Sequence, residues 1–332
     1  MGNEVLINLA LQTLGCNQAQ LAEKLGVTRA QVTKWKNGEG VSLENENKLR
    51  ALIGLSEDDE PELIEMTGGI IQAKKWEKLV IYLASLAEDG GETGYITNPF
   101  KMELGAGFFT LQTLSVLKSA GIDIPKEFPK AIDFDVDKIR LLDDKNESAR
   151  LSDLLDENPY SKLIYSCFRA LVDVYGFYAA YIEDPANELM NLAECSYSGT
   201  IENIEPSLLN LALAKLNDDS VQICSEFERF RFNTLNDYKI WLDDLKKLAY
   251  QYNVPLGAEV MHLLYDDLEE LSFQAERQSL GFNDSKIHPD IYMNELLVGM
   301  RLMHQVLPKI CEKLGITTEE LEIDPSDFTS RR

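Results

Sequence analysis

Residues 17–38 read NQAQLAEKLGVTRAQVTKWKNG and predict two short helices joined by a tight turn. Apolar residues recur at helical spacing in the first helix, and Gly26 ends it. Thr28 and Gln31 form a capping-box pattern at the start of the second helix, which Gly38 stops. The arrangement is typical of an element that lays its second helix in the major groove of DNA.

Two further helices are expected to complete a small domain around this motif. One is predicted over residues 4–14 and ends at Gly15, and the other follows Ser42 and reaches Ile53. The apolar residues that we expect to face inward are Leu6, Leu9, Ala10, Leu14, Leu21, Ala22, Leu25, Val32, Trp35, Leu49, Leu52 and Ile53. Residues 1–56 are therefore predicted to be a helix-turn-helix DNA-binding domain.

The polar face of the second helix of the motif carries side chains that can read or hold DNA. Arg29 can donate two hydrogen bonds to guanine, Gln31 can pair with adenine, and Ala30 can contact a thymine methyl group. Gln18 and Asn37, at helix ends, are placed to contact phosphate. The predicted DNA-binding residues are Gln18, Thr28, Arg29, Ala30, Gln31, Thr33, Lys34, Lys36 and Asn37. The alternative is a structural or protein-binding helical unit, in which Gln31 only closes its capping box.

The pattern Gln18-Ala-Gln-Leu-Ala-Glu-Lys-Leu-Gly-Val-Thr-x-x-x-Val-x-x-Trp-x-Asn-Gly resembles the lambda-repressor-like (Xre) helix-turn-helix family. The resemblance implies that Arg29, Ala30 and Lys34 face bases, and that Gln18 and Asn37 hold the DNA backbone.

This resemblance covers residues 4–54 and no more of the chain. One departure lies at Glu44 and Glu46, where relatives often carry a basic or neutral residue near phosphate. Residues 60–332 resemble no family that we recognise.

Charge is distributed unevenly along the chain. The net charge is −24, which by itself argues against a nucleic-acid binder. Residues 1–55, however, carry 6 Lys and Arg against 5 Glu, a balance of +1 that leaves −25 for the remaining 277 residues. Because affinity for DNA depends on neutralising phosphates, the acidic body must be held away from the duplex. We therefore expect a near-neutral head and a separate acidic body.

The acidic stretch Ser56-Glu-Asp-Asp-Glu-Pro61 is predicted to be the linker between head and body. A helical middle region is expected over residues 57–125. Pro125 and Pro129 mark a second boundary, beyond which residues 126–332 predict an acidic, all-helical domain for dimerisation or sensing.

The helices expected beyond the linker lie over residues 72–88, 107–120, 159–182, 206–216, 219–231, 234–252, 256–279 and 289–314. A short strand is expected near Tyr95, in the loop after the first of them. The order of helix, Gly-rich loop and helix over residues 73–123 leaves a winged-helix fold as an alternative for the middle region. The fold class predicted for the whole chain is all-α.

The last predicted helix carries one apolar stripe at intervals of four and three residues. Its members are Tyr292, Leu296, Met300, Met303, Leu307, Ile310 and Leu314. The stripe is either a dimerisation element or part of a bundle core, and Pro308 should kink the helix.

No group of residues predicts an enzyme, a metal site or a cofactor. The 5 cysteines lie far apart, so we expect free thiols in a reducing cytoplasm. Asp133, Asp135 and Asp137 could form half of a calcium loop, but Lys138 stands where that loop needs glycine, and a solvated strand edge is the preferred interpretation. The histidines, His262, His288 and His304, lack the spacing of metal ligands.

Two further stretches of the sequence indicate whether the protein is a membrane or a secreted protein. The most apolar one, residues 160–182, carries charged residues and predicts a buried helix, not a membrane span. Within it lies an aromatic cluster, interpreted as core, with a small-ligand or peptide pocket as the alternative. The cluster is Tyr175, Phe177, Tyr178 and Tyr181. The first residues lack the basic start of a signal peptide, and a cytoplasmic protein is expected.

These observations favour a sequence-specific, repressor-like transcription regulator that binds a double-stranded DNA operator as a homodimer. The alternative is a DNA-tethered interaction protein, such as an antitoxin or phage-defence component, whose acidic body binds a protein or peptide partner.

Overall fold

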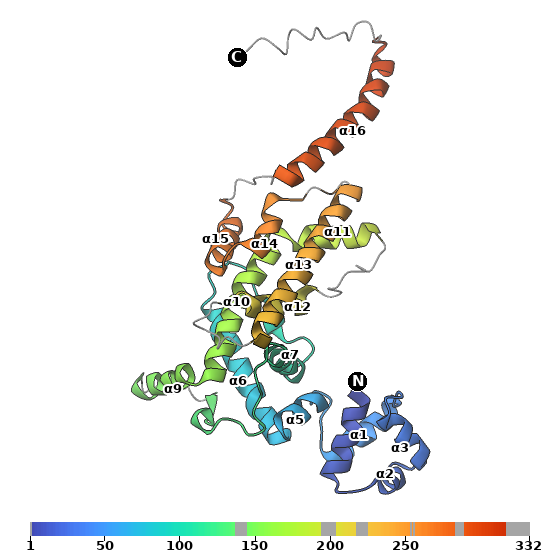
Figure 1. Ribbon diagram of the computed structural model, residues 1–332, viewed down its shortest axis with the longest axis vertical. Coiled ribbons are helices and arrows are strands. Elements are labelled where there is room, and N and C mark those ends of the chain that lie inside the picture. The colour runs from blue at the N-terminus through green and yellow to red at the C-terminus, as the bar shows by residue number, and fades with distance from the viewer. Residues whose placement is uncertain are drawn as a thin grey trace.

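The computed structural model shows a helical head joined to a larger helical body (Figure 1). It describes residues 2–136, 145–193, 204–216, 225–252, 254, 256–282 and 289–316. Every regular element within these ranges is a helix, which confirms the predicted all-α class. Nor is any helix among them long and apolar enough to cross a lipid bilayer.

The head consists of α1 (Gly2–Thr13), α2 (Gln18–Leu25), α3 (Arg29–Lys36) and α4 (Leu43–Ile53). It has its own core, formed by Leu6, Ile7, Ala10, Leu21, Ala22, Leu25, Val32, Trp35 and Leu49. The predicted inward position of Leu52 is wrong, because its side chain is 38% exposed. Leu49 and Ile53, one turn apart, occupy the inward face of α4 instead, and Leu52 lies at its edge.

The first part of the body contains α5 (Pro61–Thr67), α6 (Ile70–Asp89), η1 (Asn98–Lys101), α7 (Ala106–Ser119) and η2 (Lys130–Ile132). The sequence predicted α6 and α7 to within two residues at each end. It missed α5, because Pro61 was interpreted as part of a linker when it is the first residue of a helix, a position that proline favours.

The expected strand near Tyr95 is also wrong. The chain there forms a loop that leads into η1. A winged-helix fold needs a β-wing, and the described part of residues 73–123 has no strand to supply one.

The described residues of the second part of the body form nine further helical segments. They are α9 (Lys145–Glu157), α10 (Pro159–Tyr181), α11 (Glu183–Ala193), α12 (Ile204–Ala214), α13 (Ser225–Tyr252), η3 (Ala258–Met261), α14 (His262–Tyr265), α15 (Leu268–Ser279) and α16 (Pro289–Leu314). The sequence missed α9 and α11. It also divided α13 into two helices, whereas the structure has one continuous helix through residues 232–233.

Helix α10 is the centre of the body and packs against α6, α12 and α15. A single apolar core runs from Leu63 in α5 to Leu271 in α15. The predicted boundary between residues 125 and 126 therefore does not coincide with a break in the core, and the assignment of residues 57–125 to a region of their own stays a prediction. The aromatic cluster belongs to this core: Tyr175, Phe177 and Tyr178 are buried.

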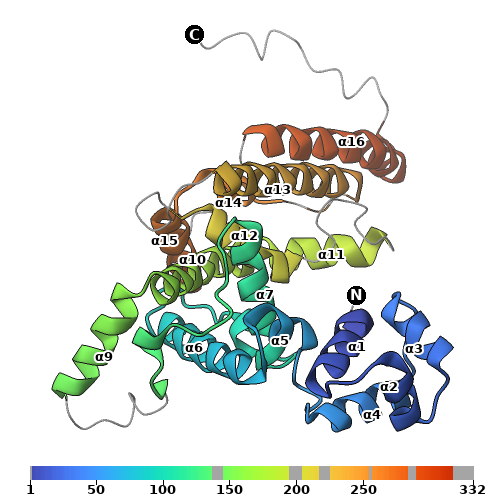
Figure 2. The same ribbon diagram turned by 60° about the horizontal axis from the view of Figure 1, so that its bottom comes forward.

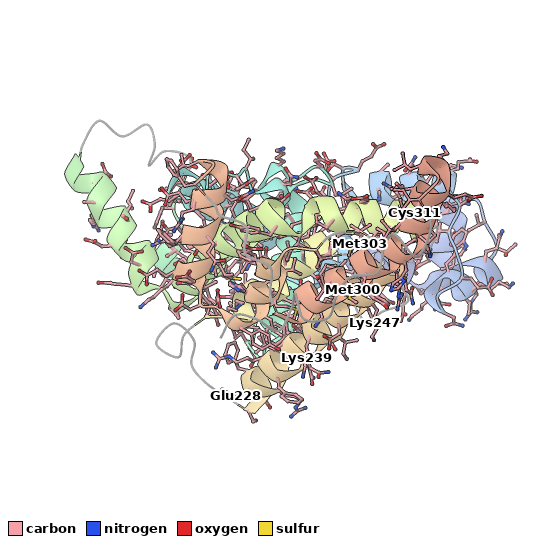
Figure 3. All side chains as sticks on the ribbon, turned by 90° about the horizontal axis from the view of Figure 1, so that it is seen from above. Glu228, Lys239, Lys247, Met300, Met303 and Cys311 are labelled. Carbon is pink, nitrogen blue, oxygen red and sulfur yellow. The ribbon has the colours of Figure 1, made fainter. Side chains whose placement is uncertain are left out.

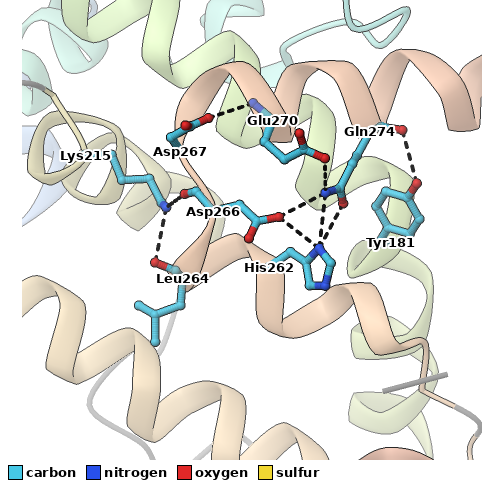
Figure 4. A network of polar contacts seen from close by, with 8 residues as sticks. All are labelled: Tyr181, Lys215, His262, Leu264, Asp266, Asp267, Glu270 and Gln274. Atoms are coloured by element: carbon cyan, nitrogen blue, oxygen red, sulfur yellow. Dashed lines mark hydrogen bonds and ion pairs between the residues drawn. The ribbon is translucent and has the colours of Figure 1, made fainter. Parts of the chain in front are cut away.

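A polar network explains why the helix predicted over residues 256–279 is interrupted (Figure 4). Asp267 caps α15, because its Oδ1 accepts the Glu270 amide at 2.9 Å. Lys215, directly after α12, donates its ammonium protons to the carbonyl oxygens of Asp266 (2.6 Å) and Leu264 (3.3 Å), which the end of α14 leaves without helical partners. Burial lowers the pKa of Lys215 to about 8, although the negative charges of Asp266 and Asp267 act to raise it.

The same network fixes His262, which pairs with Asp266 across 2.9 Å from Nδ1 to Oδ2. The Gln274 side-chain amide donates to the same Asp266 oxygen at 3.0 Å and to Glu270 at 2.9 Å. The Tyr181 hydroxyl of α10 donates to the backbone carbonyl oxygen of Gln274 at 3.1 Å. The polar side chains at this corner thus hold α14 and α15 against α10.

A polar clasp joins the head to the body at the predicted linker. Arg50 of α4 donates to the carbonyl oxygens of Ser56 (3.1 Å) and Asp59 (2.8 Å). The Asp59 carboxylate accepts the amide (2.7 Å) and the hydroxyl (2.9 Å) of Ser56 through Oδ2. Its Oδ1 lies 2.5 Å from the ammonium of Lys74 in α6, which also pairs with Glu77 at 2.9 Å. Residues 56–59 are thus bonded to both parts.

Helix α7 closes over this clasp. A Cβ at Gly107 would lie 2.6 Å from the carbonyl oxygen of Asp58, so only glycine allows α7 to approach so closely. Burial alone would raise the pKa of Asp59, but Lys74 and the two Ser56 donors outweigh it and hold the pKa below its usual value.

Replacing Asp59 with Asn should lower the free energy of unfolding by about 1–3 kcal/mol at pH 7, because the Lys74 pair is lost and the Ser56 bonds weaken. A carboxylate with a lowered pKa stabilises the fold above its unfolded pKa, and this contribution is lost as the pH falls through the folded value. The difference between the two proteins should therefore shrink below about pH 4. Urea denaturation between pH 3 and 8 measures it.

The matched control is Asp58→Asn, because Asp58 is the exposed neighbour of Asp59. Equal effects of the two substitutions would contradict a specific role for the clasp.

Candidate nucleic-acid interface

Two capping boxes fix where α2 and α3 begin. Asn17 accepts the amides of Ala19 (3.0 Å) and Gln20 (3.1 Å), and the Gln20 side chain accepts the Asn17 amide at 2.9 Å. Thr28 and Gln31 repeat the arrangement at α3, with bonds of 2.9 and 3.3 Å. The sequence predicted the second box but missed the first, although Asn-x-x-Gln before an apolar helix is the same signal.

The buried face of α3 holds it against the rest of the head. Val32 is fully buried and Trp35 is 6% exposed, and both belong to the core that α1 and α2 share. Since residues three and four apart share a helix face, the remaining positions of α3 point outward. The exposed ones are Arg29, Ala30, Gln31 and Lys34, while Thr33 and Lys36 are partly buried. The ends of the motif, Thr28 and Asn37, are exposed as well.

Four of the predicted DNA-binding side chains form hydrogen bonds with one another within the head: Gln18, Thr28, Gln31 and Thr33. The Gln31 amide oxygen accepts both the amide (2.9 Å) and the hydroxyl (3.1 Å) of Thr28. The Thr33 hydroxyl lies 3.0 Å from Gln18 Oε1, which links the start of α2 to the middle of α3. These contacts orient the two helices, and Arg29, Ala30 and Lys34 remain exposed on α3.

One ion pair lies at the edge of this face. Lys34 Nζ is 3.3 Å from Glu39 Oε2, and the side chains are 61% and 59% exposed. A pair so exposed contributes little to stability, so a phosphate can compete for Lys34.

The two acidic residues that depart from the resemblance are paired inside α4. Glu44 lies 2.6 Å from Lys48, and Glu46 lies 3.1 Å from Arg50, each one helical turn away. The hydrogen bond from Lys48, with its charge, lowers the pKa of Glu44. Glu46 also holds the arginine of the clasp. Each carboxylate is therefore compensated by a cation within its own helix.

The described residues contain no comparable arrangement of side chains for catalysis or for metal binding. These contain no cluster of three or more His, Cys, Asp or Glu that could hold a metal ion. Burial raises the pKa of the Cys167 thiol to about 12, which makes it inert at neutral pH. Asp133 and Asp135 face lysines of α6 and do not lie on a strand edge, while Asp137 and His288 lie outside the described residues.

Comparison with known proteins identifies the head alone. Residues 7–59 match the family described as helix-turn-helix, of the Xre or lambda-repressor-like type. This is a family of DNA-binding domains, not of enzymes, and the match supports a DNA-binding regulator. No curated protein and no solved structure matches the chain. The rest of the chain stays without a family.

Replacing Arg29 and Lys34 together with Ala should remove sequence-specific DNA binding and leave the fold intact, because both side chains are exposed and neither packs in the head core. Loss of one bidentate base contact costs about 1–3 kcal/mol, or roughly ten- to a hundredfold in affinity. Fluorescence anisotropy with a selected duplex measures it, and circular dichroism checks the fold.

The control is Lys24→Ala, which removes one positive charge from the last turn of α2, where the double variant removes two. If the double variant lost no more affinity than this control, α3 would not be the recognition helix.

Proposed function

We propose that the protein is a sequence-specific, repressor-like transcription regulator that binds an operator in double-stranded DNA through α3. The observation that carries this proposal is the outward face of α3, which presents Arg29, Ala30 and Lys34 from a helix fixed by a capping box and two buried side chains. The near-neutral head can approach the duplex, whereas the acidic body cannot do so without electrostatic cost.

Selection from a random pool of duplexes tests this directly. We expect an enriched sequence that wild-type protein binds more tightly than a scrambled duplex of the same length. The logarithm of the affinity should fall linearly with the logarithm of the salt concentration, with a slope of about −0.9 for each phosphate contacted. Failure to enrich any sequence, even at low salt, would overturn the proposal.

The proposal includes a homodimer, because one small head makes few base contacts and paired heads read two half-sites. Helix α16 supports it. The stripe side chains on α16 are 40 to 67% exposed, which favours the dimerisation element over the bundle core. They are Leu296, Met300, Met303, Leu307, Ile310 and Leu314. The helix continues through Pro308, and the predicted kink stays a prediction.

Helix α16 contacts its own body along a limited surface. It contacts α13 and η3. Figure 2 draws it next to α13, whereas Figure 1 shows that it extends away from the rest of the body. The Arg301 guanidinium lies 5.1 Å from the centre of the Tyr250 ring and donates a hydrogen bond to its hydroxyl. This polar contact fixes α16 to α13 without covering the stripe, on which Met300 and Met303 are labelled in Figure 3.

The spacing of the stripe suits pairing with a second helix of the same kind. The alternation of four and three residues over 296–314 equals the a and d positions of a heptad repeat. The positions beside this seam carry His304, Val306 and Cys311, with Lys313 near the end, and no carboxylate. Two copies can therefore approach without repulsion between acids, although each body is strongly acidic.

We expect Met303→Glu and Leu307→Glu to convert the dimer into a monomer, because each would place a charge within the paired seam. Affinity for an operator with two half-sites should then fall by about a hundredfold, while affinity for a single half-site stays the same. Light scattering after gel filtration gives the mass, and anisotropy gives the affinities.

Gln305→Glu is the control, since Gln305 is exposed on α16 but lies off the stripe. A wild-type chain that is monomeric at all concentrations would contradict the dimer. Stoichiometric copurification of a different protein, lost in the same variants, would favour the alternative in which the body binds a protein partner.

A further inference from the structure

A hollow of about 350 Å³ lies between the head and the body, beside the clasp. Its apolar wall comes from Leu9, Ile53 and Leu55 on the head side, and from Ile64, Ile70 and Ile71 on the body side. The volume is in the range of pockets that hold small ligands, and such pockets occur preferentially where two domains meet. The hollow therefore has the size and the lining for an apolar group.

A second hollow, of about 500 Å³, continues from the first along the outer face of α6. Ile70 and Ile71 line both hollows, so the two are contiguous. Lys75 and Lys78 follow Ile71 at intervals of four and three residues, which places the three side chains in one row. The combined site is thus apolar at the junction and cationic about 6 to 10 Å further along α6.

The cationic end already holds carboxylates of the protein itself. Lys75 Nζ is 2.5 Å from Asp133, and Lys78 Nζ is 3.8 Å from Asp135. Phe134, between the two acids, lines the same hollow. These contacts show that the two lysines bind carboxylates. Ion pairs as exposed as these are worth about 0–1 kcal/mol, so a ligand carboxylate can replace them.

We propose that this combined site binds a small amphipathic carboxylate, with an acyl chain of medium length in the junction hollow and its carboxylate beside Lys75 and Lys78. Apolar burial against Ile70 and Ile71 supplies most of the affinity, and the lysines select an acid over a neutral compound of the same length.

Such a ligand touches both the head and the body. It therefore stabilises the arrangement in which α1 of the head is docked against α5. If DNA binds to that docked arrangement, the ligand raises the affinity for the operator. If DNA binds to a different arrangement of head and body, the ligand lowers the affinity for the operator, by the same linkage. This consequence, unlike the site itself, rests on the proposed function.

Calorimetry of the full chain with decanoate, below its micelle concentration, tests the site without DNA. We expect saturable binding at one site per chain and weaker binding of decanol. Ile71→Glu should abolish binding, because it places a carboxylate where the two hollows meet. The matched control is Ile81→Glu on the same helix, since Ile81 is 39% exposed and lines neither hollow. It should leave binding unchanged.

A second pair of variants separates ligand binding from a purely structural role of the Lys75–Asp133 pair. Lys75→Gln should weaken decanoate binding by about three- to tenfold and leave decanol binding unchanged. Asp133→Asn should strengthen decanoate binding, because it removes the internal competitor. If the Lys75–Asp133 pair had only a structural role, both substitutions would change the affinity for decanoate in the same direction.

Absence of decanoate binding at millimolar concentration would overturn the proposal, as would equal loss in the two isoleucine variants. Equal binding of decanol and decanoate would overturn the role of the lysines. Because these measurements contain no DNA, they can fail while operator binding succeeds, and the reverse also holds.

Discussion

The Asp59 carboxylate is the one group on which the arrangement of the two parts depends. It lies in the most acidic stretch near the head, yet it is 4% exposed, and it receives the Ser56 donors on one side and Lys74 on the other. Arg50 holds the backbone of the same stretch from the head. A segment whose composition suggests a solvated linker is instead an ordered polar joint between two apolar cores.

The separation of the cores explains how one chain combines a near-neutral head with a body that carries most of the charge. Leu9 of α1 and Leu55 pack against the body core, and Leu55 packs against the head core as well. The joint therefore combines the polar clasp with a few apolar side chains, which is the kind of interface that a ligand or a duplex can bias with a few kcal/mol. A large apolar interface would have fused the two parts into one.

The head could be predicted almost residue by residue, because its signals are local. Gly26 ends α2, Thr28 and Gln31 cap α3, and the apolar residues recur with the period of a helix. The candidate site is predicted from the same pattern and stays a prediction, and the structure adds that Gln31 and Thr33 are hydrogen-bonded inside the head. The Gln31 bond belongs to the capping box that the sequence predicts, whereas the bond between Thr33 and Gln18 depends on the crossing of α2 and α3, which no local pattern encodes.

The body was predicted less well, because there tertiary contacts decide the boundaries. The continuity of α13 and the interruption before α15 depend on partners far along the chain, such as Lys215 for the carbonyl of Asp266. The clasp was missed for the same reason, since nothing near Asp59 in the sequence indicates that Lys74 would neutralise it. Long-range polar contacts of this kind are invisible to hydrophobic periodicity.

The division into two cores also gives each part its own optical reporter. The chain has 3 tryptophans. Trp35 lies in the head core, whereas Trp76 and Trp241 lie in the body core, where Trp76 is wedged edge-on between Phe128 and Tyr160. Intrinsic fluorescence therefore mixes two signals that a single Trp35→Phe replacement separates. The thermal unfolding of the head can then be followed as the difference in fluorescence between the wild-type chain and the Trp35→Phe variant, without attaching a dye to either part.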